Sequence, residues 1–450
     1  MNTLFNVSLW GDEAFSALLA QKPFLEMLKI VVHDTSPPLF YFITFFWSRI
    51  FGSSEIAIRS LSFIFYIATA LIVYSITKKL FDKKTGIIAA VLTFFNPFLF
   101  PYAFEGRMYF CLLFFVTLSF YFLITKNKVC YILAAAAALY SHHFAILAII
   151  PQFLWQFFQS LRPKNQFNPK PEQVRFGANN LTIKRLFKTY LAVAVLYLPW
   201  VYPLFLQTKL VAGGFWLGRP KINDLINVFT HFANVNVLPN FQNKVLIITA
   251  LLLLLRKWRK KDKSKDLLLT FWLIFPPVAA FLISQTKTSI FYERYLLYCL
   301  PPAMLLLSSN LRKISYFLIL PIVVINLFSS YQLFTHPFKK PFREFALWIK
   351  ANIPSDVFLI NYNGKAHHLW ESKYYGIEAP IYSENPELPF FVGTAQMTKE
   401  DIVSDLPEDK TICLITSDKI ETVAIKNYEV ENYYPFDDFT FACLKSLPEE

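Results

Sequence analysis

The feature that most constrains this chain is a series of long apolar stretches that alternate with short basic loops. Leu61–Thr77 and Tyr316–Tyr331 contain no charged residue. A helix that crosses a bilayer core needs roughly 20 mostly apolar residues. Only 17% of the 450 residues are charged, whereas soluble domains usually carry about 25%. The sequence therefore predicts an α-helical polytopic membrane protein.

The apolar stretches predict ten membrane spans, of which the fourth and the seventh are short for a bilayer. The expected spans are residues 57–77, 86–102, 108–125, 129–141, 144–161, 189–206, 245–255, 267–284, 295–309 and 314–332. A further apolar stretch at 37–51 is interpreted as a helix that lies at the outer interface and leads into the first span. If this stretch were a span, every later loop would lie on the opposite side of the membrane, and the basic loops would lie outside.

Lys and Arg are concentrated in alternate loops. Five of these loops carry 22 Lys and Arg in all, at residues 78–84, 126–128, 162–188, 256–265 and 312–313. Basic loops of this kind stay on the cytoplasmic side. The N-terminus, the loops at 101–107, 207–244 and 285–294, and the tail are therefore expected outside. Since the formal charge of +13 arises in these loops, no nucleic-acid partner is expected.

The tail has a different composition from the rest of the chain. Residues 333–450 hold 11 Lys and Arg and 19 Asp and Glu. Helical patterns at Arg343–Ile353 and His367–Tyr375 alternate with strand-like runs at Val357–Asn361, Thr411–Thr416 and Thr440–Leu444, which is typical of a small α/β domain. We expect an outer loop with juxtamembrane helices at 1–56, a transmembrane helical domain at 57–332 and an extracytoplasmic α/β domain at 333–450.

The five cysteines and seven histidines show no metal-ligand spacing, so neither a metal nor another cofactor is expected. Cys413 and Cys443 each fall in a strand-like run, which leaves open a disulfide on an oxidising side of the membrane. His142 and His143 have no carboxylate or cysteine partners at ligand spacing. Packing at the interface is the favoured interpretation of this pair.

Four clusters of polar and aromatic residues fall on the expected outer side. They are Trp10-Gly11-Asp12-Glu13-Ala14, His33-Asp34 through Tyr41, Glu105-Gly106-Arg107-Met108-Tyr109 and Tyr292-Glu293-Arg294-Tyr295. A general base must reach the proton that it accepts. A departing phosphate needs a cation close to its developing charge. Both ingredients occur on the same expected face.

Ordinary structural roles account for the same residues. Asp12 and Glu13 could be the cap and solvated first turn of a helix over Ala14–Ala20. Arg107 and Arg294 could be interfacial side chains whose charged ends extend to water. Tyr109 and Tyr295 could belong to an aromatic belt. Composition alone leaves both interpretations open.

Taken in order, these motifs resemble the membrane glycosyltransferases of the C superfamily, and most closely the dolichyl-phosphate-mannose-protein mannosyltransferase and aminoarabinose transferase type. The matching features are Trp-x-Asp-Glu-Ala at 10–14, Asp-x-x-Pro-Pro-Leu-x-Tyr at 34–41, Phe-Gly-x-x-Glu-x-x-x-Arg at 51–59, Arg-x-Tyr at 107–109, Arg-Tyr-Leu-Leu at 294–297 and the tail entry at 343–349. The resemblance covers about residues 5–350. It implies a sugar donor that is linked to a polyprenyl phosphate and presented from the membrane, and transfer on the outer face without a nucleotide sugar.

The resemblance also implies roles for single residues. Asp12 matches the catalytic carboxylate of the first outer loop, and Glu13 is a neighbour that orients it. Arg294, with Arg107, is expected to hold the lipid phosphate, and Tyr295, Tyr109 and Glu105 belong to the same donor site. His33 and Asp34 lie in a loop expected to face donor or acceptor.

Family members carry a transmembrane helix before the Asp-Glu loop, whereas this sequence begins inside that loop, which leaves open whether a first helix is missing upstream of Met1. The favoured function is an inverting glycosyltransferase that uses an acceptor hydroxyl. The alternatives are a transporter or flippase, or a ligase or polymerase, of lipid-linked glycans. A transporter usually has ionisable groups near the bilayer midplane and paired repeats, and the sequence shows neither. The acceptor could be a protein, a lipid or a glycan.

Overall fold

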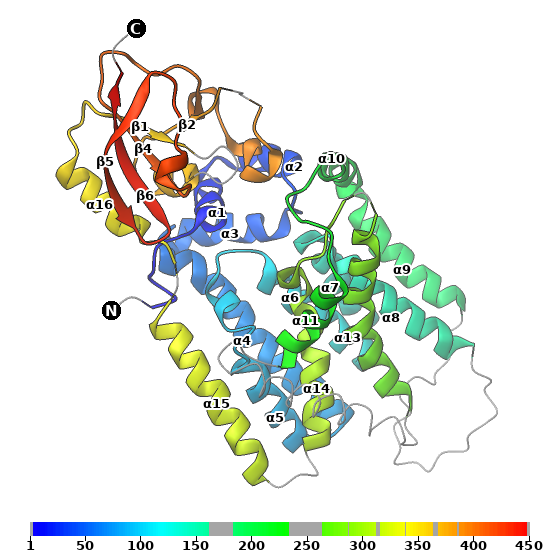
Figure 1. The fold of residues 1–450 in the computed structure, drawn as a ribbon. Coiled ribbons are helices and arrows are strands. Elements are labelled where there is room, and N and C mark those ends of the chain that lie inside the picture. Colours follow the sequence, from blue (N-terminus) through cyan, green and yellow to red (C-terminus); the bar gives the residue numbers. More distant parts are fainter. Residues whose placement is uncertain are drawn as a thin grey trace, which may run out of the picture. The chain divides into compact units, whose positions relative to one another are not determined.

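The computed structural model describes residues 3–161, 183–233, 263–286, 288–311, 316–337, 339–362, 368–384 and 387–447. The chain forms two compact units (Figure 1). The first, here called the sheet unit, comprises Met1–Thr35, Tyr41–Ser60 and His336–Glu450. The second, the helical unit, comprises Ser36–Phe40 and Leu61–Thr335.

The helical unit contains most of α4, which starts in the sheet unit, and then a succession of helices and short 3₁₀ segments. These are α4 (Glu55–Leu80), α5 (Lys83–Phe94), η1 (Pro101–Phe104), α6 (Tyr109–Thr125), α7 (Lys128–Ser141), α8 (Ala145–Ser160), α9 (Ile183–Tyr197), η2 (Leu198–Trp200), α10 (Val201–Ala212), α11 (Ile222–Ala233), α13 (Lys263–Ser284), η3 (Glu293–Cys299), α14 (Leu300–Leu311) and α15 (Tyr316–Thr335).

The helices of this unit pack against one another in pairs. α6 packs against α7, α8 against α13, and α5 against α14. Their outward faces are apolar, as with Leu71 on α4 and Leu191 on α9, which are 62% and 63% exposed. Since a soluble protein rarely exposes large apolar areas, these faces suit a lipid environment.

Three helices in the described ranges are long and apolar enough to cross a membrane: Glu55–Leu80, Ile183–Ala212 and Ser264–Ser284. Other apolar helices, such as α6, α7 and α8, are shorter. The expectation of a mostly helical protein with a C-terminal sheet domain is confirmed, while the number of ten spans stays a prediction. The span expected at 245–255 lies outside the described residues.

Prolines divide several of the apolar stretches that the sequence presents as continuous. The stretch at 86–102 holds α5, which ends at Phe94, and then the 3₁₀ turn η1. The stretch at 295–309 starts as η3 and continues as α14 at Pro301 and Pro302. Proline lacks a backbone N–H and clashes with the preceding turn, so the helical hydrogen bonds break there.

The sheet unit combines three N-terminal helices with the elements of the tail. They are α1 (Gly11–Gln21), α2 (Phe24–His33), α3 (Leu39–Phe51, of which the first two residues belong to the other unit), α16 (Phe342–Asn352), β1 (Phe358–Asn361), α17 (Leu369–Tyr374), β2 (Ile381–Tyr382), η4 (Phe390–Val392), η5 (Thr394–Gln396), η6 (Lys399–Asp401), β3 (Ile402–Val403), β4 (Ile412–Thr416), η7 (Ile420–Thr422), β5 (Tyr428–Phe436) and β6 (Phe439–Ser446).

Its six strands form one mixed sheet in the order β3-β2-β1-β4-β6-β5. The first four are parallel, and β6 and β5 run antiparallel at the other end. Successive side chains of a strand point to opposite faces. On β4, Ile412 and Leu414 accordingly pack on one face, while Cys413 and Ile415 pack on the other.

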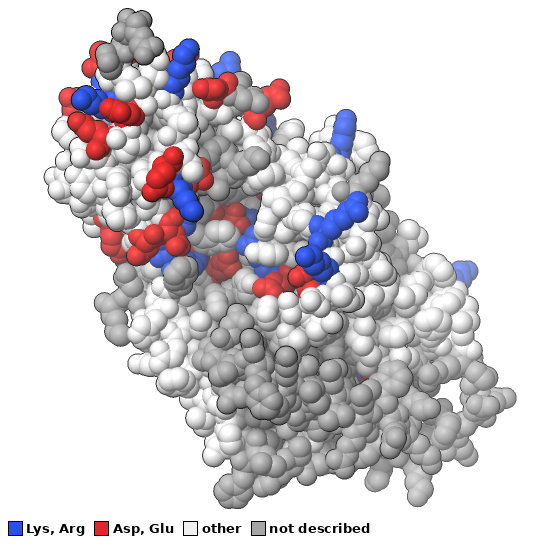
Figure 2. All heavy atoms as spheres, in the orientation of Figure 1, with Lys and Arg blue, Asp and Glu red and all other residues white. Residues whose placement is uncertain are grey.

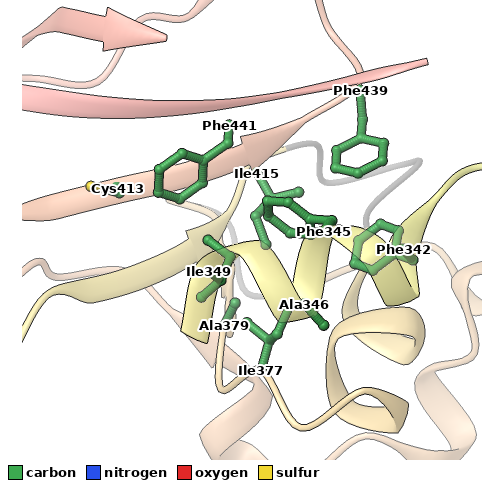
Figure 3. Close-up of a cluster of buried hydrophobic side chains, with 10 residues drawn as sticks. All are labelled: Phe342, Phe345, Ala346, Ile349, Ile377, Ala379, Cys413, Ile415, Phe439 and Phe441. Carbon is green, nitrogen blue, oxygen red and sulfur yellow. The ribbon is translucent and has the colours of Figure 1, made fainter. Parts of the chain in front are cut away.

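Helix α16 covers one face of this sheet. Its Phe342, Phe345 and Ile349 point toward β4 and β6, as Figure 3 shows, and meet Phe439 and Phe441 there. The helix expected at Arg343–Ile353 and the strands expected at Val357–Asn361, Thr411–Thr416 and Thr440–Leu444 are confirmed to within two residues. Cys413 and Cys443, which pair across β4 and β6, form the disulfide that the sequence left open.

Charged groups are distributed unevenly over the surface. On the face drawn in Figure 2, Asp and Glu are spread over the strands and α16, whereas the described helices of the helical unit show long stretches without charge. A solvated surface carries many charges and a lipid-facing one carries few. The two units therefore match a water-exposed domain and a membrane domain.

Candidate functional site

Helix α1 positions the two adjacent carboxylates of the first cluster. Its N-cap is Trp10, which makes no side-chain cap hydrogen bond, and Asp12 and Glu13 fall in the first helical turn. Asp12 is therefore not the N-cap residue. The negative charge of Asp12 is still stabilised by the positive end of the helix dipole. Asp12 is half-buried, whereas Glu13 is fully buried.

Glu13 is enclosed by two cations. Arg59 Nε donates to Oε1 at 2.9 Å and Arg59 Nη2 to Oε2 at 2.6 Å. Lys339 Nζ lies 2.8 Å from Oε2. Burial alone would raise the pKa of Glu13, but the charges of Arg59 and Lys339 and their hydrogen bonds lower it to about 2. Glu13 is thus ionised and fully engaged.

Arg59 ties the segment before α1 to the same carboxylate. Its remaining N–H groups donate to the carbonyls of Phe5, Val7 and Ser8. All five donors of a guanidinium are then used, and the side chain is completely buried. The Glu13–Arg59 pair therefore fixes where α1 begins, and through it the position of Asp12.

Helix α17 lies against the start of α1. A Cβ on Gly11 would lie 3.4 Å from both oxygens of Glu371, so that carboxylate is close to the helix N-terminus. Glu371 is buried, and His368 Nδ1 lies 3.6 Å from its Oε1. His368 Nε2 is 2.8 Å from Ser417 Oγ, which also accepts from Lys340 Nζ at 3.0 Å. A polar network thus lies near Gly11, at the N-terminus of α1.

His33 and Asp34 lie at the end of α2. His33 is exposed, and its Nδ1 lies 2.9 Å from the Lys29 carbonyl. Asp34 accepts a hydrogen bond from the Tyr41 hydroxyl at 3.4 Å. Both residues are in the sheet unit with Asp12 and Glu13. Their expected role toward donor or acceptor stays a prediction.

A second cluster, made of one arginine and three tyrosines, lies in the helical unit. The Arg294 guanidinium carbon is 4.6 Å from the ring centroid of Tyr292, 5.2 Å from that of Tyr109 and 5.8 Å from that of Tyr295. The rings of Tyr109 and Tyr295 are themselves 6.1 Å apart. Cation–π contacts hold a guanidinium in place, so the cation is preorganised.

Glu105 and Arg107 form a tight turn in front of α6. The Arg107 N–H donates to the Glu105 carbonyl at 2.7 Å, and Ser62 Oγ donates to the same carbonyl at 2.6 Å. Glu105 is buried and Arg107 is half-buried. The charges of Arg107 and Arg294 both act on His142, so Arg107 is a second arginine near that histidine.

The structure thus places the nine predicted site residues in two groups. Asp12, Glu13, His33 and Asp34 belong to the sheet unit, and the other five belong to the helical unit. The catalytic and donor-binding assignments themselves stay predictions. Within the described residues, no group of three or more His, Cys, Asp or Glu side chains could hold a metal ion.

Several residues of these clusters were not singled out from the sequence. Arg59 belongs to the matched motif at 51–59, and its pairing with a distant Glu13 could not be read from spacing. Lys339 and Glu371 come from the tail, more than 300 positions from Glu13. His142 was interpreted as a packing residue. Nothing in the sequence near His142 indicated that it would lie near the arginines.

The fold and part of the sequence are similar to known proteins. Residues 35–171 match the family model of the dolichyl-phosphate-mannose-protein mannosyltransferases. No curated protein matches the chain. The resemblance to membrane glycosyltransferases that the motifs predicted is confirmed by this match and by the fold.

Three solved structures show that fold. ArnT from Cupriavidus metallidurans in the apo state has a TM-score of 0.66 and 11% identity, over 98% of this chain and 95% of that one. ArnT bound to undecaprenyl phosphate has a TM-score of 0.62, 10% identity and the same coverage. The oligosaccharyltransferase AglB from Archaeoglobus fulgidus, in complex with an inhibitory peptide and a dolichol-phosphate, has a TM-score of 0.51 and 13% identity, over 92% and 67%.

Proposed function

We propose that this chain, as a membrane glycosyltransferase similar to the dolichyl-phosphate-mannose-protein mannosyltransferases, transfers a sugar from a polyprenyl-phosphate donor to an acceptor hydroxyl. The observation that carries the proposal is Arg294, held by its three tyrosines, together with Arg107, whose charge acts on the same His142. The two arginines offer two cations to a phosphate. The matched family and the ArnT fold support a lipid-linked donor.

The reaction is a single displacement. The acceptor oxygen attacks the anomeric carbon, and the bond between that carbon and the phosphate oxygen breaks. Asp12 accepts the proton of the acceptor hydroxyl as the new glycosidic bond forms. The lipid phosphate leaves with the bonding electrons, and Arg294 and Arg107 neutralise its charge. One displacement inverts the anomeric centre.

The neighbouring carboxylates then have separate tasks. Glu13 is fully engaged by Arg59 and Lys339, so it holds α1 and does not accept the proton. Asp12 is half-buried in the first turn of α1, and it is the carboxylate that the family resemblance implies as the base. We assign the base to Asp12 and the positioning of the helix to Glu13.

The outer face is the proposed side of reaction. The Cys413–Cys443 disulfide supports this, since structural disulfides persist in oxidising compartments. The acidic surface of the sheet unit and the basic loops between helices agree with it. The acceptor site would lie in the polar surroundings of Asp12.

The test is a donor panel. Membranes that contain the full chain receive labelled polyprenyl-phosphate sugars one at a time, and both sugar transfer and release of polyprenyl phosphate are followed. We expect one donor class to be consumed, with the anomeric configuration inverted in the product. Consumption of no donor, or consumption of nucleotide sugars instead, would overturn the proposal.

A further inference from the structure

His142 is held in a defined position at the end of α7. It is the C-cap residue of that helix, and 8% of its surface is exposed. Its ring lies 4.9 Å from the ring of Tyr295 and 5.3 Å from that of Phe144. The aromatic contacts keep the imidazole against the tyrosine that also contacts Arg294.

The hydrogen bonds of His142 set its tautomer. The backbone N–H of Phe144 donates to Nδ1 at 3.1 Å, so Nδ1 is an acceptor. A neutral imidazole carries its one proton on the other nitrogen when the first accepts. The hydrogen-bond donor of His142 is therefore Nε2.

The surroundings keep this ring neutral. Burial lowers the pKa of His142, and the nearby His143, Arg107 and Arg294 lower it further, to about 3. A protonated ring would add a third positive charge beside two arginines. The neutral ring keeps one N–H donor there without that repulsion.

We propose that His142 Nε2–H is a third hydrogen-bond donor to the phosphate of the lipid-linked sugar, together with Arg107 and Arg294. This inference rests on the proposed function and adds a residue to its donor site. A neutral donor near two cations suits a phosphate diester, which carries one negative charge. The neutral His142 donor fixes the position of the phosphate and adds no further positive charge to the site.

The adjacent His143 has a different environment and serves as the matched control. Its Nε2 lies 2.8 Å from Gln207 Oε1, and its Nδ1 lies 3.4 Å from the Tyr197 hydroxyl. Burial also lowers the pKa of His143, to about 4, but no arginine contributes. Both ring nitrogens of His143 are engaged within the protein, so its role is structural.

Binding of undecaprenyl phosphate to the purified full chain tests the inference. Hydrogen bonds to charged groups contribute enough for about a 10- to 100-fold loss of affinity when one is removed. His142→Phe keeps the stacked ring without a donor, and we expect Kd to rise by that factor. His142→Gln places an amide N–H near the Nε2 position, and Kd should stay within about 3-fold. His143→Phe should leave Kd unchanged.

Two further results keep the test decisive if His142→Phe does not fold. His142→Asn places its amide near the Nδ1 position, so it should lose affinity while His142→Gln retains it. Equal affinity for the wild type and a folded His142→Phe or His142→Asn overturns the inference. Equal loss in His142→Gln and His142→Asn also overturns it, since the role is then structural. If the wild type binds no polyprenyl phosphate, the proposed function fails instead.

Discussion

At the scale of single residues, Asp12 and Glu13 show how two adjacent carboxylates acquire different properties. Only Glu13 faces the interior, where Arg59 and Lys339 neutralise it. Asp12 is turned about 100° around the helix and stays half-buried. The motif at 10–14 was enough to predict that Asp12 and Glu13 are both site residues. It could not separate their roles, because the cations that distinguish them come from α4 and from the tail.

Asp12→Asn tests the proposed base. The substitution keeps the size of the side chain and removes the charge, and we expect turnover to fall by roughly 10²–10⁴-fold. Loss of the helix-dipole interaction should lower stability by about 0.3–1 kcal/mol. Transfer assays and thermal melts measure the two effects. Near-normal turnover in the variant would reject Asp12 as the base.

Glu13→Gln is expected to act through stability. It leaves the charges of Arg59 and Lys339 buried without their partner, which typically costs on the order of 3–5 kcal/mol. Denaturation in detergent should show this loss. Asp12→Asn is the matched control, and a Glu13→Gln protein as stable as that control contradicts the assigned role.

The same pair predicts a pH dependence. The folded protein lowers the pKa of Glu13 from 4.5 to about 2. Its ionised form therefore contributes stability that is complete above pH 4.5 and is lost as the pH falls toward 2. Melting curves from pH 7 to pH 3 should show a steeper decline below pH 4.5 in the wild type than in Glu13→Gln. Parallel curves would argue against the ion pair.

At the scale of elements, the strength of the sequence pattern decided what could be predicted. Long apolar helices and the buried strands β4 and β6 carry a clear pattern, and their positions were predictable. The edge strand β5 was missed because most of its side chains are exposed and it contains Pro435. β2 and β3 have two residues each, too few for any alternation to be visible.

The disulfide between β4 and β6 closes a loop whose ends are 30 residues apart. Loop-closure entropy gives it a stabilising effect of about 3–4 kcal/mol. We expect Cys413→Ala with Cys443→Ala, or a reductant, to lower the melting temperature of the sheet unit accordingly. Cys130→Ala is the control, because Cys130 is a free cysteine. The same melting temperature with and without reductant would contradict the bridge.

Gly393, between η4 and η5, is closely packed against neighbouring side chains. A Cβ there would lie 2.6 Å from Trp370 Nε1 and 3.1 Å from Phe15, and the residue has a φ of +89°. Trp370 cannot simply move away, because its Nε1 donates to the Val392 carbonyl at 3.0 Å.

Gly393→Ala should therefore destabilise the protein by more than the roughly 1–2 kcal/mol cost of a positive φ. Gly52→Ala isolates that cost, since Gly52 has a φ of +80° and no atom within 4 Å of a Cβ. Denaturant titration of the two variants gives the difference. Equal losses would mean that the contact with Trp370 relaxes freely.

At the scale of the whole molecule, local patterns gave the class of protein and the succession of its parts. They could not show that Met1–Thr35 and Tyr41–Ser60 form one compact unit with His336–Glu450. Contacts between such distant segments depend on packing and charge complementarity, as between Glu13 and Lys339, and leave no periodic signal. The three-part division at 56 and 332 stays a prediction.

The charge asymmetry predicts the topology. Reporter fusions after residue 447 should report an extracytoplasmic location, and insertions between Lys126 and Lys128 a cytoplasmic one. Cysteine labelling of intact cells with a membrane-impermeant reagent checks the same two points. A cytoplasmic signal from the tail would invert the proposed topology, and with it the side of the reaction.

The pairing of Glu13 with Lys339 has a consequence for how the protein is made. The two residues are 326 positions apart, and translation adds roughly 5–20 residues per second. Arg59 follows Glu13 by only 46 positions, but the first helix must wait roughly 15–65 s before its second cationic partner, Lys339, exists, and Glu371 and Ser417 arrive later still. During this interval the N-terminal segment is exposed to proteases and to wrong partners. Assembly of the surroundings of Asp12 is thus a late event in biogenesis, and a nascent chain halted before residue 336 should leave α1 open to proteolysis.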